Sequence, residues 1–183
     1  MGPNTVTLAG FAGSILTCVL ILERYWLAAG FVFVAAGMMD MLDGSVARLS
    51  GRATPFGAFL DSTLDRTAEG LVLGAIGVVL AKDGHWWALG AAFAALTASF
   101  LVSYTRARAE GLGIDSNRGG LMARPERLVL IGAGIFFAPF GATLQVVMFV
   151  LAGLTILTVV QRVIFVWRAL PRAEANRPGG RDS

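Results

Sequence analysis

Residues 26–81 read WLAAGFVFVAAGMMDMLDGSVARLSGRATPFGAFLDSTLDRTAEGLVLGAIGVVLA, and this stretch decides the fold. It holds two apolar runs, 26–47 and 57–81. Each is long enough for a helix across the hydrocarbon core of a membrane, which takes about 20 residues. Residues 50–55 (SGRATP) lie between the runs and are typical of a turn. The stretch therefore predicts two antiparallel membrane helices joined at one face of the bilayer.

Four further apolar runs flank this pair, at 5–22, 86–109, 125–141 and 144–168. Hydrophobic residues make up 56% of the 183 residues and charged residues only 15%, and the mean hydropathy of +0.70 is far from the range of soluble domains. We therefore expect an all-α, polytopic membrane protein with six transmembrane helices in one bundle. This single domain would cover residues 1–171, and residues 172–183 would form a flexible C-terminal tail.

Basic residues set the expected orientation of the bundle. With six spans, both termini and the connections after the second and fourth spans share one side, where nearly all the arginines fall. The other side has only Arg24 and Lys82. An excess of Lys and Arg marks the cytoplasmic face, so both termini should be cytoplasmic, in the cell membrane. No cationic region or cleavage site precedes the first span, which would therefore be retained rather than removed as a signal peptide.

Composition and spacing also exclude some classes of protein. Most basic residues lie at the ends of apolar runs and are typical of a membrane interface, so no nucleic-acid partner is expected. One cysteine, Cys18, cannot form a disulfide scaffold or a cysteine-ligated metal site. Glycines within the runs should let helices pack closely, and these are Gly70, Gly74, Gly77, Gly132 and Gly134.

Four aspartates stand at the ends of the second and third apolar runs, where an ionised carboxylate is costly unless it is paired, hydrated or bound to metal. Asp40 and Asp43 are three residues apart and Asp61 and Asp65 are four apart, so each pair lies on one helical face. The turn between the runs should bring the two pairs to face each other. Glu69, one turn beyond Asp65, is expected to hydrogen-bond within the bundle.

Clustered carboxylates repel one another at low dielectric, and hard divalent cations with oxygen ligands relieve that repulsion. Two such cations can clamp a phosphoryl or pyrophosphate group during an in-line displacement. The alternative is a structural salt-bridge network between the aspartates and Arg48, Arg52 and Arg66. Four aspartates at tight spacing with Gly44 and Gly57 exceed what such a network requires, which favours metal.

The acidic motif as a whole, Asp40-x2-Asp43-Gly44-x2-Ala47-Arg48-x8-Gly57-x3-Asp61-x3-Asp65, resembles the signature of the CDP-alcohol phosphatidyltransferase family. The resemblance extends along nearly the full chain. It implies a six-helix membrane enzyme, usually a homodimer, that moves a phosphatidyl group from a CDP-linked lipid to an alcohol and releases CMP.

The resemblance also implies roles for individual residues. Asp40, Asp43 and Asp61 would hold two Mg²⁺ or Mn²⁺ ions, and Asp65 would complete the second metal site and act as the base on the acceptor hydroxyl. The CDP portion would be bound by Asn4, Thr5, Val6, Thr7, Gly44, Ala47, Arg48, Thr54 and Gly57. Arg48 would offer a planar fork to a phosphate oxygen, or alternatively extend to the lipid headgroups.

Five arginines indicate what kind of alcohol accepts the phosphatidyl group. They end the fourth run, open the fifth and lie within the sixth, and they are Arg106, Arg108, Arg124, Arg127 and Arg162. On the face of the aspartates they would bind a dianionic phosphate, which predicts an acceptor that already carries one. The alternative is that cytoplasmic helix ends simply collect arginine.

Residues 61–66 (DSTLDR) and these arginine segments resemble the family branch that uses inositol 1-phosphate, which contains bacterial phosphatidylinositol phosphate synthases and archaeal archaetidylinositol phosphate synthases. The expected substrates are CDP-diacylglycerol and inositol 1-phosphate, and the products are phosphatidylinositol phosphate and CMP. Glycerol 3-phosphate as acceptor, as in phosphatidylglycerophosphate synthases, and an archaeal CDP-archaeol donor remain open. A cation or proton transporter is a rival from another class, but the acids cluster at one membrane face and no sequence repeat is visible.

Overall fold

The computed structural model describes residues 3–49, 54–114 and 120–175, although side chains of 3–6, 40–49 and 172–175 lie outside the described part. The described residues form six helices and no strand. The helices are α1 (Pro3–Leu22), α2 (Trp26–Leu49), α3 (Pro55–Lys82), α4 (Trp86–Gly111), α5 (Arg124–Phe136) and α6 (Thr143–Ala175). Each predicted apolar run forms a helix, which confirms the all-helical prediction.

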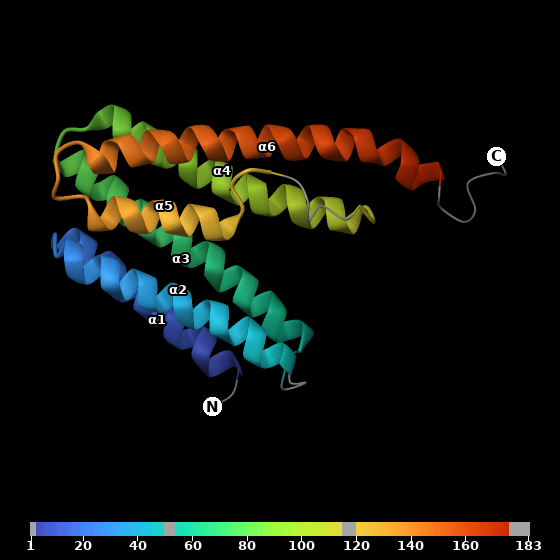
Figure 1. The fold of residues 1–183 in the computed structure, drawn as a ribbon, viewed down its shortest axis with the longest axis horizontal. Helices are drawn as coiled ribbons and strands as arrows, with labels where there is room; N and C mark the ends of the chain where they lie inside the picture. The colour runs from blue at the N-terminus through green and yellow to red at the C-terminus, as the bar shows by residue number, and fades with distance from the viewer. Residues whose placement is uncertain (1–2, 50–53, 115–119, 176–183) are drawn as a thin grey trace.

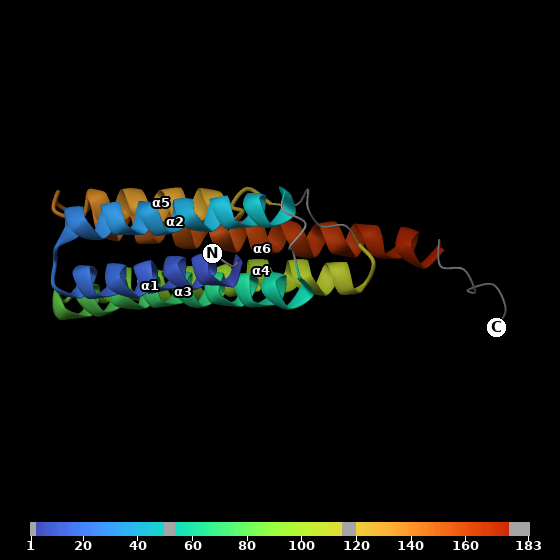
Figure 2. The same cartoon turned by 90° about the horizontal axis from the view of Figure 1, so that it is seen from below.

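The helices form two layers of three (Figures 1 and 2). One layer contains α1, α3 and α4, and the other contains α2, α5 and α6. Helix α1 packs on α2 and α4 packs on α6, so the six helices form a closed ring of neighbours. Helices α3 and α5 are therefore the middle helices of the two layers.

The two ends of the bundle differ in what they hold. Helices α1, α3 and α5 begin and helices α2, α4 and α6 end toward one end of the bundle (Figure 1), which we call the acidic end because the four aspartates of the motif are on its helices. At the other end, Arg24 donates to Asp83 from Nη1 to Oδ2 at 3.0 Å and joins the α1–α2 turn to the α3–α4 turn. These hydrogen bonds from Arg24 lower the pKa of Asp83.

Local signals set the helix boundaries. Thr54 caps α3, because its Oγ1 accepts a hydrogen bond from the Gly57 N–H at 3.0 Å and Pro55 follows in the first turn. The predicted span 125–141 is too long, since α5 ends at Phe136. Pro139 disfavours helical geometry at the residue before it, and Gly141 has φ of +61°. Helix α6 extends beyond the predicted end at residue 168.

The surface of the bundle is apolar. Helix α4 and residues 143–171 of α6 are long and apolar enough to cross a membrane, whereas the apolar parts described in α1 and α2 are shorter. Large apolar side chains such as Phe31, Phe93 and Val129 are exposed, in far greater number than on a soluble protein. This surface is typical of helices that face lipid.

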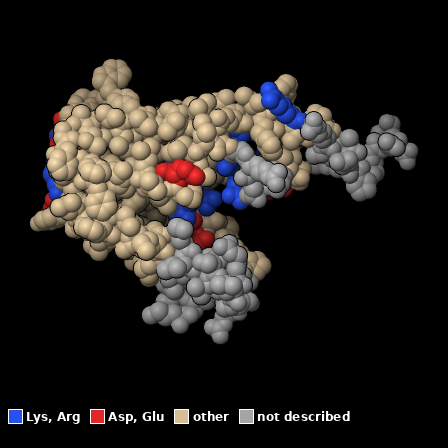
Figure 3. Space-filling view, in the orientation of Figure 1, with Lys and Arg blue, Asp and Glu red and all other residues tan. Residues whose placement is uncertain are grey.

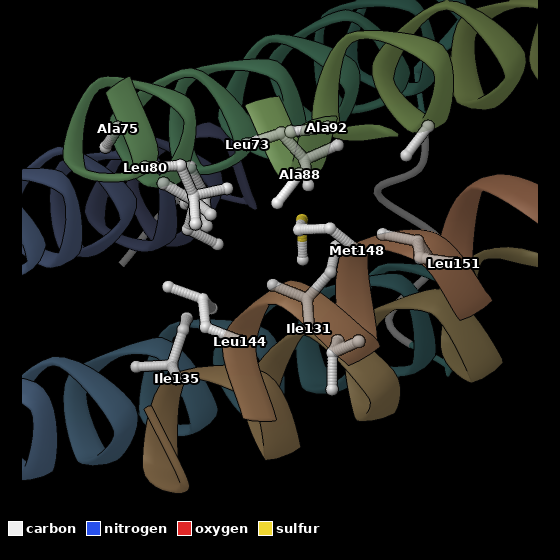
Figure 4. Packing of buried hydrophobic residues seen from close by; sticks show 14 of the residues in the cluster. Leu73, Ala75, Leu80, Ala88, Ala92, Ile131, Ile135, Leu144, Met148 and Leu151 are labelled. Carbon is white, nitrogen blue, oxygen red and sulfur yellow. The ribbon is translucent and has the colours of Figure 1, made fainter. Parts of the chain in front are cut away.

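The core lies between the two layers (Figure 4). Leu73 of α3 lies opposite Met148 of α6, and Leu80 of α3 lies opposite Leu144 of α6 and Ile135 of α5. Buried threonines satisfy their hydroxyls locally in this apolar setting by donating to the carbonyl four residues earlier, and they are Thr17, Thr155 and Thr158. The core therefore brings few polar atoms that need a partner on another helix.

Glycines let helices approach closely, as predicted. A Cβ atom on Gly134 would lie 2.9 Å from Val147 of α6, and one on Gly132 would lie 3.4 Å from Phe33 of α2. A Cβ atom on Gly77 would lie 3.3 Å from Leu89 of α4, and one on Gly70 would lie 3.5 Å from Phe100 of α4. Gly74 differs, because none of the described atoms lies within 4 Å of such a Cβ, so it makes no contact of this kind within the chain.

We expect Gly134→Ala to destabilise the protein by about 1–3 kcal/mol, because the added methyl overlaps the β-branched Val147 and separates α5 from α6. Gly74→Ala is the matched control, and its better helix propensity should leave stability unchanged or raise it by up to about 1 kcal/mol. Thermal unfolding of the detergent-purified protein measures both variants. Equal unfolding midpoints for the two would contradict the packing role of Gly134.

Candidate active site

Helix α3 carries the second half of the acidic motif. Asp61 and Asp65 lie one turn apart near its capped start, and the side chain of Asp65 is only 10% exposed. Arg124, at the start of α5, reaches Asp65 with Nη1 2.5 Å from Oδ2. The predicted base is therefore nearly buried and lies beside a guanidinium from the opposite layer.

The other half of the motif lies on α2, where the helix continues through Asp40 and Asp43 and so keeps them on one face. Their side chains are outside the described part. Within the described residues, no group of three His, Cys, Asp or Glu side chains is placed to hold a metal ion. The motif offers only carboxylate oxygens from two consecutive helices, a donor set that fits hard divalent cations.

One turn beyond Asp65, a second ion pair joins the middle helices of the two layers. Arg127 donates from Nε and Nη2 to the two carboxylate oxygens of Glu69, at 2.7 and 2.9 Å. The two side chains are only 2% and 4% exposed. This two-point contact satisfies both charges inside the bundle, which confirms the hydrogen-bonding expected of Glu69.

The segment before α5, residues 120–123, forms a strap against α6. The backbone N–H of Leu121 donates to Oε1 of Gln161 at 3.1 Å, and that of Met122 donates to Oγ1 of Thr158 at 3.0 Å. Arg127 donates from Nη1 to the Met122 carbonyl at 3.3 Å. Gly120 has φ of +117°, and a Cβ there would lie 2.5 Å from Thr158, so no larger residue fits this path.

The remaining predicted arginines lie on α4 and α6. Arg162 is only 6% exposed, donates from Nη1 to the Val102 carbonyl at 3.1 Å, and has a buried Nε with no hydrogen-bond partner among the described residues. Arg106 pairs with Glu110 at 2.9 Å one turn away. Arg108 is exposed.

These arginines are close enough to act on one another electrostatically. Arg106 and Arg127 lie near enough to Arg162 for their charges to repel its guanidinium group, and Arg124 and Arg127 stand in the same relation to Arg66. Figure 3 shows basic and acidic side chains gathered in a hollow at this end of the protein. Such a concentration of guanidinium groups in a partly buried site suits a multiply charged anion.

A cavity of about 450 Å³ lies beside the ion pairs, between α1, α2, α3 and α5. Its walls are mostly apolar, with Phe33, Leu128 and Phe136 among them. Asp65, Glu69 and Arg124 supply charged groups to its lining, to which Thr7 of the predicted CDP-binding set also contributes. The cavity therefore suits a molecule with an apolar part and a charged group.

The rest of the predicted CDP-binding set is placed only in part. Thr54 and Gly57 form the cap of α3, a structural contact that the motif by itself did not indicate. Several members of this set have side chains outside the described part, and they are Asn4, Thr5, Val6, Ala47 and Arg48. The surroundings of Gly44 are outside it as well.

The sequence interpretation did not identify the strap or its anchors, Thr158 and Gln161. It also assigned Arg127 to the acceptor without linking it to Glu69. A signal for that link was present, because the acids on α3 are one turn apart and the arginines on α5 are one turn apart. Two acids and two arginines at the same one-turn spacing can form two ion pairs when their helices face each other.

Comparison with known proteins identifies relatives along the whole bundle. Phosphatidylinositol phosphate synthase from Mycolicibacterium smegmatis is 40% identical over 178 residues, which cover 88% of this chain and 75% of the relative. Archaetidylinositol phosphate synthase from Methanothermobacter thermautotrophicus is 36% identical over 167 residues, with 90% and 83% covered.

Solved structures agree with the sequence relatives. The crystal structure of Mycobacterium tuberculosis phosphatidylinositol phosphate synthase with CDP-DAG bound matches with a TM-score of 0.83 and 32% identity, covering all of this chain and 91% of that one. A second crystal structure of that enzyme, in complex with manganese and citrate, matches with a TM-score of 0.82.

The profile of the CDP-alcohol phosphatidyltransferase family matches residues 1–171, which include all four aspartates of the motif and all five predicted acceptor arginines. Together with relatives above 30% identity that cover most of the chain, this match establishes that the protein belongs to the CDP-alcohol phosphatidyltransferase family.

Proposed function

We propose that this protein is a membrane enzyme that transfers the phosphatidyl group of CDP-diacylglycerol to inositol 1-phosphate, releasing CMP. The observation that carries the proposal is the contact between Arg124 and Asp65, which gives a phosphorylated acceptor a place next to the predicted base. The names of the relatives, including the solved enzyme with CDP-DAG bound, support the same substrates.

The cavity is a suitable place for part of the lipid donor. Its apolar walls, from α1, α2 and α5, can hold lipid chains, and its charged lining comes from the segment where the phosphate chemistry is expected. Thr7 in that lining agrees with the proposed CDP-binding stretch at the start of α1. The diphosphate of the donor would then lie near Asp61 and Asp65, within reach of the acceptor.

The arginines would hold the phosphate of the acceptor. Arg124 is the best placed of them, since it contacts Asp65 while its side chain is still 32% exposed. Arg162 offers a buried guanidinium whose Nε has no described partner, and Arg106 acts on it from α4. A phosphate bound here would bring a hydroxyl of the same molecule toward the carboxylate of Asp65.

The reaction follows from this arrangement. Asp65 takes the proton of the acceptor hydroxyl, the acceptor oxygen forms a bond to the phosphorus that carries diacylglycerol, and the bond from that phosphorus to the CMP oxygen breaks. Asp40, Asp43, Asp61 and Asp65 would bind two Mg²⁺ or Mn²⁺ ions, which would supply charge neutralisation for the diphosphate and the leaving CMP. A solved relative in complex with manganese supports a metal requirement.

The proposed setting is the cell membrane, with six helices crossing it and the acidic end facing the cytoplasm. Nearly all arginines fall in the sequence segments assigned to that end, where α1 begins and α6 ends, and the positive-inside rule supports this orientation. The enzyme would act as a homodimer through apolar helix faces. Water-soluble inositol 1-phosphate would enter from the cytoplasm, and the lipid donor would enter from the bilayer.

We expect turnover to require Mg²⁺ or Mn²⁺ and to be abolished by Asp61→Asn, because a carboxamide lacks the charge that binds and bridges divalent cations. Release of CMP, measured with and without chelator, gives the result, and thermal unfolding shows whether the variant is folded. Asp83→Asn is the matched control, since it removes a carboxylate at the other end of the bundle. Full turnover in excess chelator would show that the reaction does not require a divalent cation, and the proposed metal site would be wrong.

Asp65→Asn should lower the rate of transfer far more than it lowers affinity for CDP-diacylglycerol, since removal of the acceptor proton matters in the transition state and not in the donor complex. Donor binding and single-turnover transfer can be measured separately on the purified variant. Equal losses in the two would reassign Asp65 to a structural or metal-holding role.

Arg124→Ala and Arg162→Ala should each raise the KM for inositol 1-phosphate about 10- to 150-fold, because each removes charge-assisted hydrogen bonds worth about 1.5–3 kcal/mol. The KM for CDP-diacylglycerol should barely change. Arg168→Ala, at an exposed arginine further along α6, is the matched control and should leave both values unchanged.

The wild-type enzyme, assayed with inositol 1-phosphate, glycerol 3-phosphate, inositol and serine, tests the choice of acceptor in the same experiment. Inositol 1-phosphate should be used best, and it should be used far better than inositol or serine, which bring no phosphate for the arginines to bind. A preference for glycerol 3-phosphate would overturn inositol 1-phosphate but keep the arginine pocket. A preference for free inositol or serine would overturn the pocket as well.

A further inference from the structure

We infer that Glu69 is a positioning residue: through Arg127 it holds the start of α5 and the strap, so that Arg124 stands against Asp65. The inference rests on the proposed function, in which Arg124 binds the phosphate of the acceptor. It gives Arg127 a different task from Arg124, although both arginines lie in the first turn of the same helix.

The two ion pairs differ in how accessible they are. The two acids, Asp65 and Glu69, lie one turn apart on α3. The two arginines, Arg124 and Arg127, lie one turn apart on α5. The two ion pairs therefore join the same two helices at neighbouring levels. The Arg124 side chain is 32% exposed, whereas Arg127 is 2% exposed and Glu69 is 4% exposed. A substrate can reach Arg124 without breaking the fold, but it cannot reach Arg127 in this way.

Each nitrogen of Arg127 already donates a hydrogen bond. Nε and Nη2 contact both oxygens of Glu69, and Nη1 contacts the carbonyl of Met122. All three nitrogens of this guanidinium therefore donate to the protein itself. A phosphate at Arg127 would have to displace Glu69, and that would leave a buried carboxylate without its partner.

The start of α5 depends on these contacts because it has no cap of its own. Ala123 occupies the N-cap position and makes no side-chain cap hydrogen bond, in contrast to Thr54 at the start of α3. Arg127 holds the first turn of α5 to α3, while Thr158 and Gln161 hold the strap to α6. Arg124 lies in the chain between Met122, which is bound to α6, and Arg127, which is bound to α3. Loss of the Glu69 contact should therefore displace Arg124.

The test is a double-mutant cycle on the full-length enzyme in detergent or nanodiscs. Glu69→Gln keeps the shape of the side chain and removes its charge, and it should raise the KM for inositol 1-phosphate about tenfold while the KM for CDP-diacylglycerol changes less than about twofold. In an Arg124→Ala background, Glu69→Gln should add less than about twofold, because residues that act through one another are not additive. A purely structural role predicts additive losses, and that result would overturn the inference.

The same cycle tests the role given to Arg127. Arg127→Gln should behave like Glu69→Gln and add less than about twofold when Arg124 is already alanine. A further rise of about tenfold in that background would mean that Arg127 binds the phosphate itself, and the positioning role would be wrong.

Hydrogen exchange of the strap gives a readout that needs no acceptor. The amides of Leu121 and Met122 should exchange faster in Glu69→Gln than in the wild type, and they should be unchanged in Arg24→Gln, which breaks the ion pair at the other end of the bundle. Unchanged strap exchange in Glu69→Gln would overturn the inference, whatever the acceptor is. If exchange is faster in Glu69→Gln but the enzyme does not use inositol 1-phosphate, the link from Glu69 through Arg127 to the strap is supported and only the proposed acceptor is refuted.

A second variant covers the case in which Glu69→Gln does not fold. Thr158→Val removes the acceptor of the Met122 N–H and changes no charge. It should also raise the acceptor KM, by a smaller factor, and lose this effect in the Arg124→Ala background. An effect of Thr158→Val that persists undiminished in that background would contradict transmission through the strap.

Discussion

A charge buried among apolar helices must have a partner, and the Glu69–Arg127 pair meets this requirement at the centre of the bundle. The pair joins α3 and α5, which are the middle helices of the two layers. Two hydrogen bonds, from Nε and Nη2 of Arg127 to the two oxygens of Glu69, hold the helices together at this level. Asp65 and Arg124 form the accessible pair one turn away. In our proposal, the buried contact positions this pair.

The layered arrangement also explains why one end of the protein can carry the chemistry. At the other end, short turns and the Arg24–Asp83 pair hold the helices together without any large polar cluster. At the acidic end, acids from α3 meet arginines from α5 beside an apolar cavity, and Arg162 of α6 is buried against α4. A lipid with a diphosphate headgroup requires both environments, so its reacting atoms would lie where the apolar walls and the charged groups meet.

Two kinds of helix start surround this site and they are stabilised differently. Helix α3 has Thr54 and Pro55, so its first turn is fixed by neighbouring residues in the chain. Helix α5 has a proline in its first turn but no capping side chain, and it depends on Arg127 and on a strap bound to α6. Asp65 thus belongs to a helix whose start is stabilised locally, and Arg124 to a helix whose start is stabilised through tertiary contacts.

The sequence alone determined the six helices, because apolar runs and the turns between them are local properties of the chain. It also determined the acidic motif and the family, since both depend on residue types at short spacing. The end of α5 was predicted too far along, although Pro139 and Gly141 are local signals that stop a helix there. The tight contacts of Gly132 and Gly134 followed from the small size of glycine.

Only the tertiary structure decided which arginine meets which acid. Arg124 and Arg127 look alike in the sequence, two basic residues at the start of one helix, and both were predicted to bind the acceptor. The meeting of the two layers buries one of them against Glu69 and leaves the other accessible at Asp65. Burial depends on residues far apart in the chain, because the desolvation that forces a charge to pair exists only once the two layers have come together.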